Sequence, residues 1–201
     1  MLRTMNRHYS NPPRAAASLR CAFAVMAAFI ISACASTKMH LMRKPSTPLR
    51  TVRQVDLARF MGDWRVIASI PNFADKNCVD SIESYALRPD GKIENWFTYR
   101  KKSFAAPQTT NRTQFVVVNK ETNAEWRTKS FGLVSTNHLV IDLDPNYQWA
   151  VIGEPSRSYG WILARERALP NATYEALLDR LAVQGYDPGR FVKVPQLPGA
   201  R

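Results

Sequence analysis

The sequence predicts an all-β protein, an eight-stranded antiparallel up-and-down barrel with a C-terminal α-helix packed outside it. Short runs of alternating apolar and polar residues recur from residue 62 onward, and turn-forming residues such as Pro89, Asp90 and Gly91 separate them. A single helical pattern follows the last run. Eight consecutive strands at this spacing favour a closed barrel, because closure removes the unpaired edges that an open sheet exposes.

The first of these runs covers residues 62–70 and begins at Gly62, where the absence of a Cβ permits a sharp turn. Trp64 follows with a large apolar face, and apolar residues then alternate with the period of a strand buried on one side. The other predicted strands cover residues 80–88, 92–101, 113–119, 124–131, 138–144, 147–153 and 158–165.

The helical pattern covers residues 170–185. Leu177, Leu178 and Leu181 fall on one face with Tyr174, and Gly185 can end the helix. We expect this face to pack against the outside of the barrel, and a short strand to follow near residues 191–194.

Residues 1–54 precede the predicted domain, which covers residues 55–201. Residues 1–33 have the pattern of a lipoprotein signal peptide, with four arginines ahead of an apolar run that is too short to span a bilayer comfortably. The run ends at Cys34, after Ser32 and Ala33, and this ending resembles the lipobox of bacterial lipoproteins, in which the cysteine is lipidated. Cleavage by an ordinary signal peptidase nearby is the alternative. Residues 34–54 would then be a lipid anchor and a basic flexible tether, which either attracts anionic lipid or is simply solvated.

The charge of the chain argues against a nucleic-acid partner. The formal net charge is +12, but nine of the cations lie before residue 55, where there is no acidic residue. The predicted domain therefore carries only +3, which is too little for a nucleic-acid-binding surface. His138 is the one histidine within it, so no histidine-based triad or metal cluster is available, and we expect no cofactor.

Three short motifs follow one another along the predicted domain. Gly62 and Trp64 form a Gly-x-Trp motif, Tyr147 ends an Asp-Pro-Asn-Tyr turn, and Arg165 closes the last predicted strand. Their order and separation resemble the lipocalin family, and bacterial outer-membrane lipocalins in particular, over positions 55–195. The middle motif departs from the usual Thr-Asp-Tyr. The resemblance implies that these four residues hold the fold, with the Arg165 guanidinium stacked on Trp64.

The same resemblance implies a function. The protein would be anchored in the outer membrane through Cys34, with its barrel on the periplasmic side, and would bind, store or transport fatty acids, lysophospholipids or similar amphiphiles without being an enzyme. The strand register predicts an aromatic, mostly apolar cup, with Glu83, Asn95 or Lys101 near the ligand head group. We expect seven inward-facing residues to bind the ligand: Glu83, Tyr85, Asn95, Phe97, Tyr99, Trp126 and Trp161.

Two other functions remain open at this point. The aromatic residues can instead fill the barrel, which would leave a structural envelope lipoprotein without a ligand. A few lipocalins are isomerases, so Cys78 or Glu83 could act as the reacting group. Cys78 has no disulfide partner in the predicted domain, and we expect it to be buried. The sequence decides neither the natural ligand nor whether a homodimer forms, and a register shift of one residue would turn the cup outward.

Overall fold

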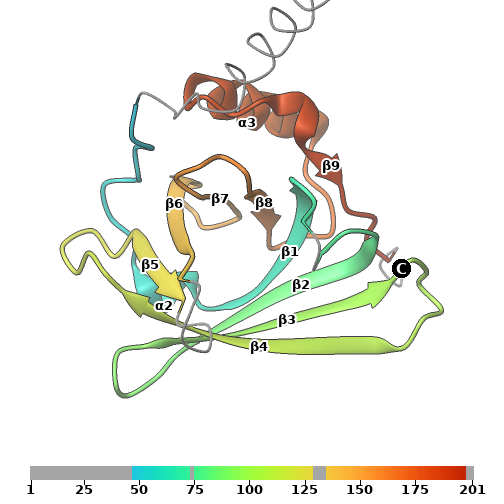
Figure 1. Ribbon diagram of the computed structural model, residues 1–201, viewed down its shortest axis with the longest axis horizontal. Helices are drawn as coiled ribbons and strands as arrows, with labels where there is room; N and C mark the ends of the chain where they lie inside the picture. Colours follow the sequence, from blue (N-terminus) through green and yellow to red (C-terminus); the bar gives the residue numbers. More distant parts are fainter. Residues whose placement is uncertain (1–46, 73–74, 129–134, 198–201) are drawn as a thin grey trace, which may run out of the picture. The chain divides into compact units, whose positions relative to one another are not determined.

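The computed structural model describes residues 47–72, 75–128 and 135–197, and Figure 1 shows their strands arranged round a common centre. The strands pair in the order β2-β3-β4-β5-β6-β7-β8-β1-β9, and an additional pairing of β2 with β1 closes the barrel. The predicted eight-stranded barrel is therefore confirmed, and β9 is an extra strand alongside β1. The nine strands are β1 (Gly62–Ser69), β2 (Cys78–Leu87), β3 (Ile93–Lys101), β4 (Gln108–Val117), β5 (Glu125–Thr128), β6 (Asn137–Leu143), β7 (Trp149–Gly153), β8 (Gly160–Ala164) and β9 (Val192–Lys193).

β1 closes the barrel because it pairs with β2 along one edge and with β8 along the other, and it also pairs with β9. Residues 62–65 pair with β2, and residues 65–69 pair with β8 on the other side. The register with β8 shifts between Val66 and Ala68, as in a β-bulge. Beyond the pairing with β2, Ala68 and Ser69 pair with β9 instead. The first strand is thus hydrogen-bonded to the last strand of the barrel and to the C-terminal segment.

The interior of the barrel is packed with apolar side chains toward one end. Trp64, Ile93, Trp126 and Leu163 are almost completely buried there. Helix α2 (Leu57–Phe60) crosses this end, and Phe60 inserts into the cluster with no exposed surface. These side chains therefore close one end of the barrel.

Helix α3 (Asn171–Val183) covers part of the outer wall, beside β6, β7 and β8 in Figure 1. Tyr174, Leu177 and Leu181 are buried against a second apolar cluster that includes Ile141 and Val151 of the sheet. The predicted helix outside the barrel is therefore confirmed, although Leu178, predicted on the same face, is only partly buried at the edge of this cluster.

Two local predictions were wrong. β4 begins at Gln108 rather than at residue 113, because a mostly polar, exposed segment still pairs its backbone with β3. Tyr147 does not begin a strand, because it lies in the turn before β7 with a φ of 60°. The Asp144 carboxylate stabilises this turn by accepting hydrogen bonds from the backbone N–H groups of Asn146 and Gln148.

Candidate functional site

The motif residues meet at the closed end of the barrel. The Arg165 guanidinium lies 3.8 Å from the centroid of the Trp64 ring and donates hydrogen bonds to the carbonyl oxygens of residues 59, 60, 61 and 63. The Trp64 indole N–H donates to the Phe60 carbonyl oxygen at 2.7 Å. The Tyr147 hydroxyl accepts a hydrogen bond from the backbone N–H of Asp56 at 2.8 Å. Gly62 has a φ of 93°, and a Cβ at this position would lie 3.4 Å from Arg165 Nη1.

A cavity of about 230 Å³ lies on the inner face of the barrel strands. Four aromatic side chains and nine polar ones form its wall. The lining residues are Asn72, Asp75, Glu83, Tyr85, Asn95, Phe97, Asn111, Thr113, Phe115, Thr128, Thr136, His138 and Trp161.

Five of the seven residues predicted to bind ligand lie on this wall: Glu83, Tyr85, Asn95, Phe97 and Trp161. Cross-strand pairing explains their convergence, because directly paired residues share a face of the sheet. Glu83 pairs with Phe97, and Tyr85 pairs with Asn95. The predicted register of β2 and β3 therefore brings these side chains into one cavity.

The other two predicted residues lie elsewhere. Trp126 is 1% exposed and packs edge-to-face against Phe60 at a centroid distance of 5.0 Å, so it belongs to the closed end rather than to the cavity wall. Tyr99 stacks on Phe97, with 4.9 Å between ring centroids. Lys101 ends β3, and its Nζ lies 3.6 Å from the Cys78 sulfur. Alternation along a strand predicts which face of the sheet a side chain occupies, but not its position along the barrel axis.

The cavity is more polar than predicted, and several of its residues were not anticipated. Asp75 precedes β2, and His138 lies on β6 directly opposite Trp126 of β5. The pairing of His138 with Trp126, known from the structure, places His138 on the inner face, whereas the sequence alone does not contain this register. Nor did any sequence pattern identify Asp75, which lies in a connection without strand periodicity.

Burial and charge change the protonation of the cavity wall. Burial, and to a smaller extent the charge of Asp75, raise the pKa of Glu83 to about 7, although the hydrogen bond from Asn95 Nδ2 at 2.7 Å opposes this shift. Burial also raises the pKa of Asp75, although hydrogen bonds from the Asn72 backbone and the Trp161 indole oppose this shift. Desolvation lowers the pKa of His138 to about 4, so its imidazole is neutral at neutral pH.

The His138 ring is held by its aromatic neighbours. It stacks on Trp161 with 5.2 Å between centroids and meets Phe115 edge-on at 4.7 Å. Its Nδ1 is shielded from solvent and has no hydrogen-bond partner among the described residues. This environment explains why a charged imidazolium is disfavoured.

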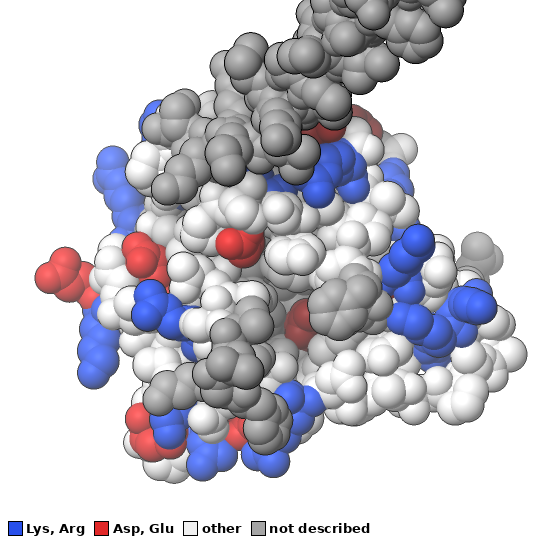
Figure 2. Space-filling view, viewed as in Figure 1, with Lys and Arg blue, Asp and Glu red and all other residues white. Residues whose placement is uncertain are grey.

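Cationic side chains lie outside the cavity, where β3 ends. A second hollow, of about 670 Å³, shares Asp75 with the cavity and runs beside β9, where Lys76, Lys102 and Lys193 line it. In Figure 2, lysine and arginine side chains gather at the right of the view, over the region where β3 ends in Figure 1. We call Lys76, Lys102 and Lys193 the rim lysines. Charge is therefore separated, with carboxyl groups inside and ammonium groups at the rim.

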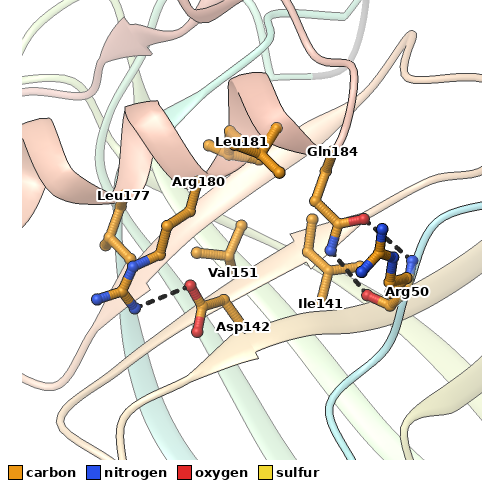
Figure 3. A pocket seen from close by; sticks show the side chains of 9 residues that line it. Arg50, Ile141, Asp142, Val151, Leu177, Arg180, Leu181 and Gln184 are labelled. Carbon is orange, nitrogen blue, oxygen red and sulfur yellow. Dashed lines mark hydrogen bonds and ion pairs between the residues drawn. The ribbon is translucent and has the colours of Figure 1, made fainter.

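A third hollow, of about 230 Å³, lies between α3 and the outer wall (Figure 3). Ile141, Val151 and Leu181 form its apolar surface. Arg180 of α3 pairs with Asp142 of β6 at 3.1 Å, and the Gln184 side chain is hydrogen-bonded to the backbone of Arg50. These polar contacts fasten the helix to the barrel on either side of the hollow.

The described residues contain no group of three or more histidine, cysteine or acidic side chains that could hold a metal ion. Nor does any helix among them have the length and apolar character needed to cross a membrane. Cys78 is buried, as the sequence predicted, and desolvation raises the pKa of its thiol.

Comparison with known proteins places this geometry in a family. A lipocalin-like domain model matches residues 55–196. Temperature-induced lipocalin-1 of Arabidopsis thaliana is 34% identical over 160 residues, which cover 74% of this chain and 83% of that protein. Outer membrane lipoprotein Blc of Escherichia coli (strain K12) is 27% identical over 178 residues, which cover 88% of this chain and 96% of that protein.

Solved structures share the fold at lower identity. Insecticyanin from the tobacco hornworm Manduca sexta superposes with a TM-score of 0.58 and 16% identity, covering 74% of this chain and 84% of that chain. The cockroach allergen Per a 4 gives a TM-score of 0.57 and 19% identity, covering 75% and 95%. With a family match across most of the chain, a barrel of the same fold and the three motifs joined at its closed end, this chain belongs to the lipocalin family.

Proposed function

We propose that this lipocalin is a lipid-anchored outer-membrane protein that binds, stores or transports small amphiphiles such as fatty acids or lysophospholipids. The observation that carries the proposal is the cavity of about 230 Å³ inside the barrel, lined by aromatic and polar side chains. The lipobox-like sequence ending at Cys34 supports the anchor, although it lies outside the described residues. A relative that covers most of the chain is named an outer membrane lipoprotein, which also supports this location.

The remaining space inside the barrel favours a carrier over a purely structural lipoprotein. A filled barrel would leave no cavity beside Phe97 and Trp161. Typical small-molecule sites measure ~300–1,000 Å³, so this cavity is small. It accommodates one part of an amphiphile, and a long acyl chain must extend through the mouth of the barrel.

A lipocalin-type isomerase is less well supported. A reactive cysteine needs a lowered pKa, because the thiolate is the nucleophile. Burial shifts the pKa of Cys78 in the opposite direction. Glu83 faces the cavity, but its nearest hydrogen-bond partner is the amide of Asn95, which holds a carboxyl group in place rather than relaying a proton.

Titration with fatty acids of increasing chain length tests the proposal. The Cys34→Ser chain is freed of bound lipid and titrated while indole fluorescence is followed. Each buried methylene contributes about 0.8 kcal/mol, so affinity should rise about fourfold per methylene and stop rising once the accessible apolar surface is covered. Trp161 should report most of the change, because it lines the cavity.

Two tryptophan variants serve as reporter and control. Trp161→Phe should lose most of the fluorescence change, whereas Trp149→Phe should keep it, because Trp149 packs with the outer cluster and has Arg180 5.6 Å from its ring. No response at any chain length, in protein shown to be folded and empty, would support the structural lipoprotein instead.

A further inference from the structure

The interior charge of the barrel is unusual for a site that takes acidic ligands. Asp75 and Glu83 both line the cavity, and the described lining residues include no lysine or arginine. The charge of Asp75 raises the pKa of Glu83, so a negative charge on Asp75 makes a second negative charge in the cavity less favourable. An anion that entered this space would meet like charge without a cationic partner.

The other titratable groups around the two carboxyls do not supply a positive charge inside. His138 is held neutral by desolvation, and burial places the pKa of Tyr85 well above its usual value. Lys101 is the cation that acts on Asp75, whose pKa it lowers, but Lys101 is exposed at the end of β3 and is not part of the cavity wall. Cys78 lies beside Lys101 and is a neutral thiol because burial raises its pKa.

The remaining polar groups of the wall can accept hydrogen bonds from a ligand. Asn111 and Thr113 of β4 contribute amide and hydroxyl groups to the same wall, and these uncharged groups can accept hydrogen bonds as well as donate them. The amide nitrogen of Asn95, the nearest donor, is already bound to Glu83 Oε2. The wall therefore offers acceptors for a donor head group.

We propose that the barrel cavity prefers amphiphiles whose polar group enters it as a hydrogen-bond donor, and a protonated amine above all, and that it binds amphiphiles whose carboxylate would enter less tightly. This inference rests on the proposed function and narrows its ligand class. The small cavity holds the head group, and the apolar chain leaves through the mouth. The opposite orientation, with the chain inside and the head group at the rim lysines, would favour a carboxylate instead.

The two orientations predict opposite orders of affinity for ligands of one chain length. Calorimetric titration of the Cys34→Ser chain with decylamine, decanol and decanoate, at neutral pH and below their micelle concentrations, measures this order. We expect decylamine to bind tightest and decanoate weakest, with at least about a tenfold difference between them. Non-specific attraction would act the other way, because residues 55–201 carry a net charge of +3.

Glu83→Gln isolates the carboxyl group, because glutamine keeps the size and an acceptor oxygen for Asn95. The variant should reduce the preference for decylamine over decanoate by about tenfold, since one opposite charge is removed. Glu125→Gln is the matched control, because Glu125 lies on β5 outside the cavity lining and should leave the order unchanged. Asp75→Asn provides a second variant on the same wall, should Glu83→Gln fail to fold. Circular dichroism and a thermal melt establish folding for each protein.

A pH series adds an independent readout. Glu83 loses its proton as the pH rises through about 7, so the preference for the amine should increase over that range and Glu83→Gln should weaken the increase. If decanoate binds as tightly as decylamine, or if Glu83→Gln changes nothing, the inference is overturned while the proposed carrier function stands. If none of the three ligands binds, the proposed function itself fails.

Discussion

Arg165 holds the closed end of the barrel with both the face and the edge of its guanidinium. The face stacks on Trp64, and the edge donates to four carbonyl oxygens around α2. These donors satisfy backbone groups that would otherwise lie unpaired where the chain enters β1. The residue thus acts on stability and lies away from the cavity wall.

Arg165→Ala should therefore destabilise the protein without changing its ligand preference. The stacking contributes about 1–2 kcal/mol, and the charge-assisted hydrogen bonds bring the expected loss in free energy of unfolding to ~2–4 kcal/mol. Urea denaturation measures this loss. Arg59→Ala is a useful comparison, because Arg59 stacks on Tyr147 at 4.1 Å but is exposed, so its removal should cost less than about 1 kcal/mol. An Arg165→Ala protein of unchanged stability that no longer binds ligand would contradict the structural role.

Glu83 should make the barrel less stable at neutral pH than at acidic pH. Its pKa rises from 4.5 to about 7 on folding, so the folded state holds the proton more tightly than the unfolded state does. Stability is therefore lost as the pH rises from 4.5 through about 7, by ~1–3 kcal/mol for a half-buried group. The stability of Glu83→Gln relative to the natural protein should increase over this range and then level off.

The comparison isolates Glu83 because His138 is present in both proteins. His138 acts in the opposite direction, since its lowered pKa removes stability as the pH falls from 6.5 through about 4. Urea titrations at several pH values give the difference directly. A difference that stays constant from below pH 4.5 to above pH 7 would show that Glu83 ionises equally well in the folded and unfolded states.

At the scale of elements, the sequence predicted the strands wherever apolar residues alternate. It did not predict the first half of β4, because residues 108–112 are exposed and mostly polar, and their pairing with β3 is made by the backbone. Helix α2 has only four residues, too few for helical periodicity, and its position depends on the burial of Phe60 and the cap of Asp56. Tertiary contacts therefore decide these two elements.

The sequence predicted which face of each strand lines the cavity, but it predicted neither the position of each side chain along the barrel axis nor the polarity of the cavity wall. Alternation placed Glu83, Asn95 and Trp161 on the inner face, and they do line the cavity. The same alternation placed Trp126 beside them, although this side chain fills the closed end. The position of a side chain along the barrel axis depends on the tilt of its strand and on the register in which that strand pairs with its neighbours. A single sequence does not contain these registers.

At the scale of the whole molecule, the lipid anchor that we propose at Cys34 would distinguish this protein from a freely diffusing barrel. Cys34→Ser should leave the chain unprocessed by the lipoprotein pathway and without acyl chains, because the thiol is the atom that would be acylated. Mass spectrometry of the intact protein, together with fractionation of the membranes, measures both effects. Cys78→Ser is the control and should keep the lipid, since Cys78 is buried within the barrel. Acyl chains that persist at the N-terminus of Cys34→Ser would refute the lipobox assignment.

The closure of the barrel through β1 also determines when the protein can fold. Residues 65–69 find their partners in β8, and Arg165 bonds to the Asp63 carbonyl oxygen 102 positions earlier in the chain. Ala68 and Ser69 pair with β9, residues 192 and 193, which lie still farther along the chain. Contacts so distant in sequence slow folding, since the entropy of closing a long loop must be lost before they form. A chain emerging from its N-terminus cannot complete its first strand until nearly all of it has emerged, so the barrel can close only after synthesis is almost finished.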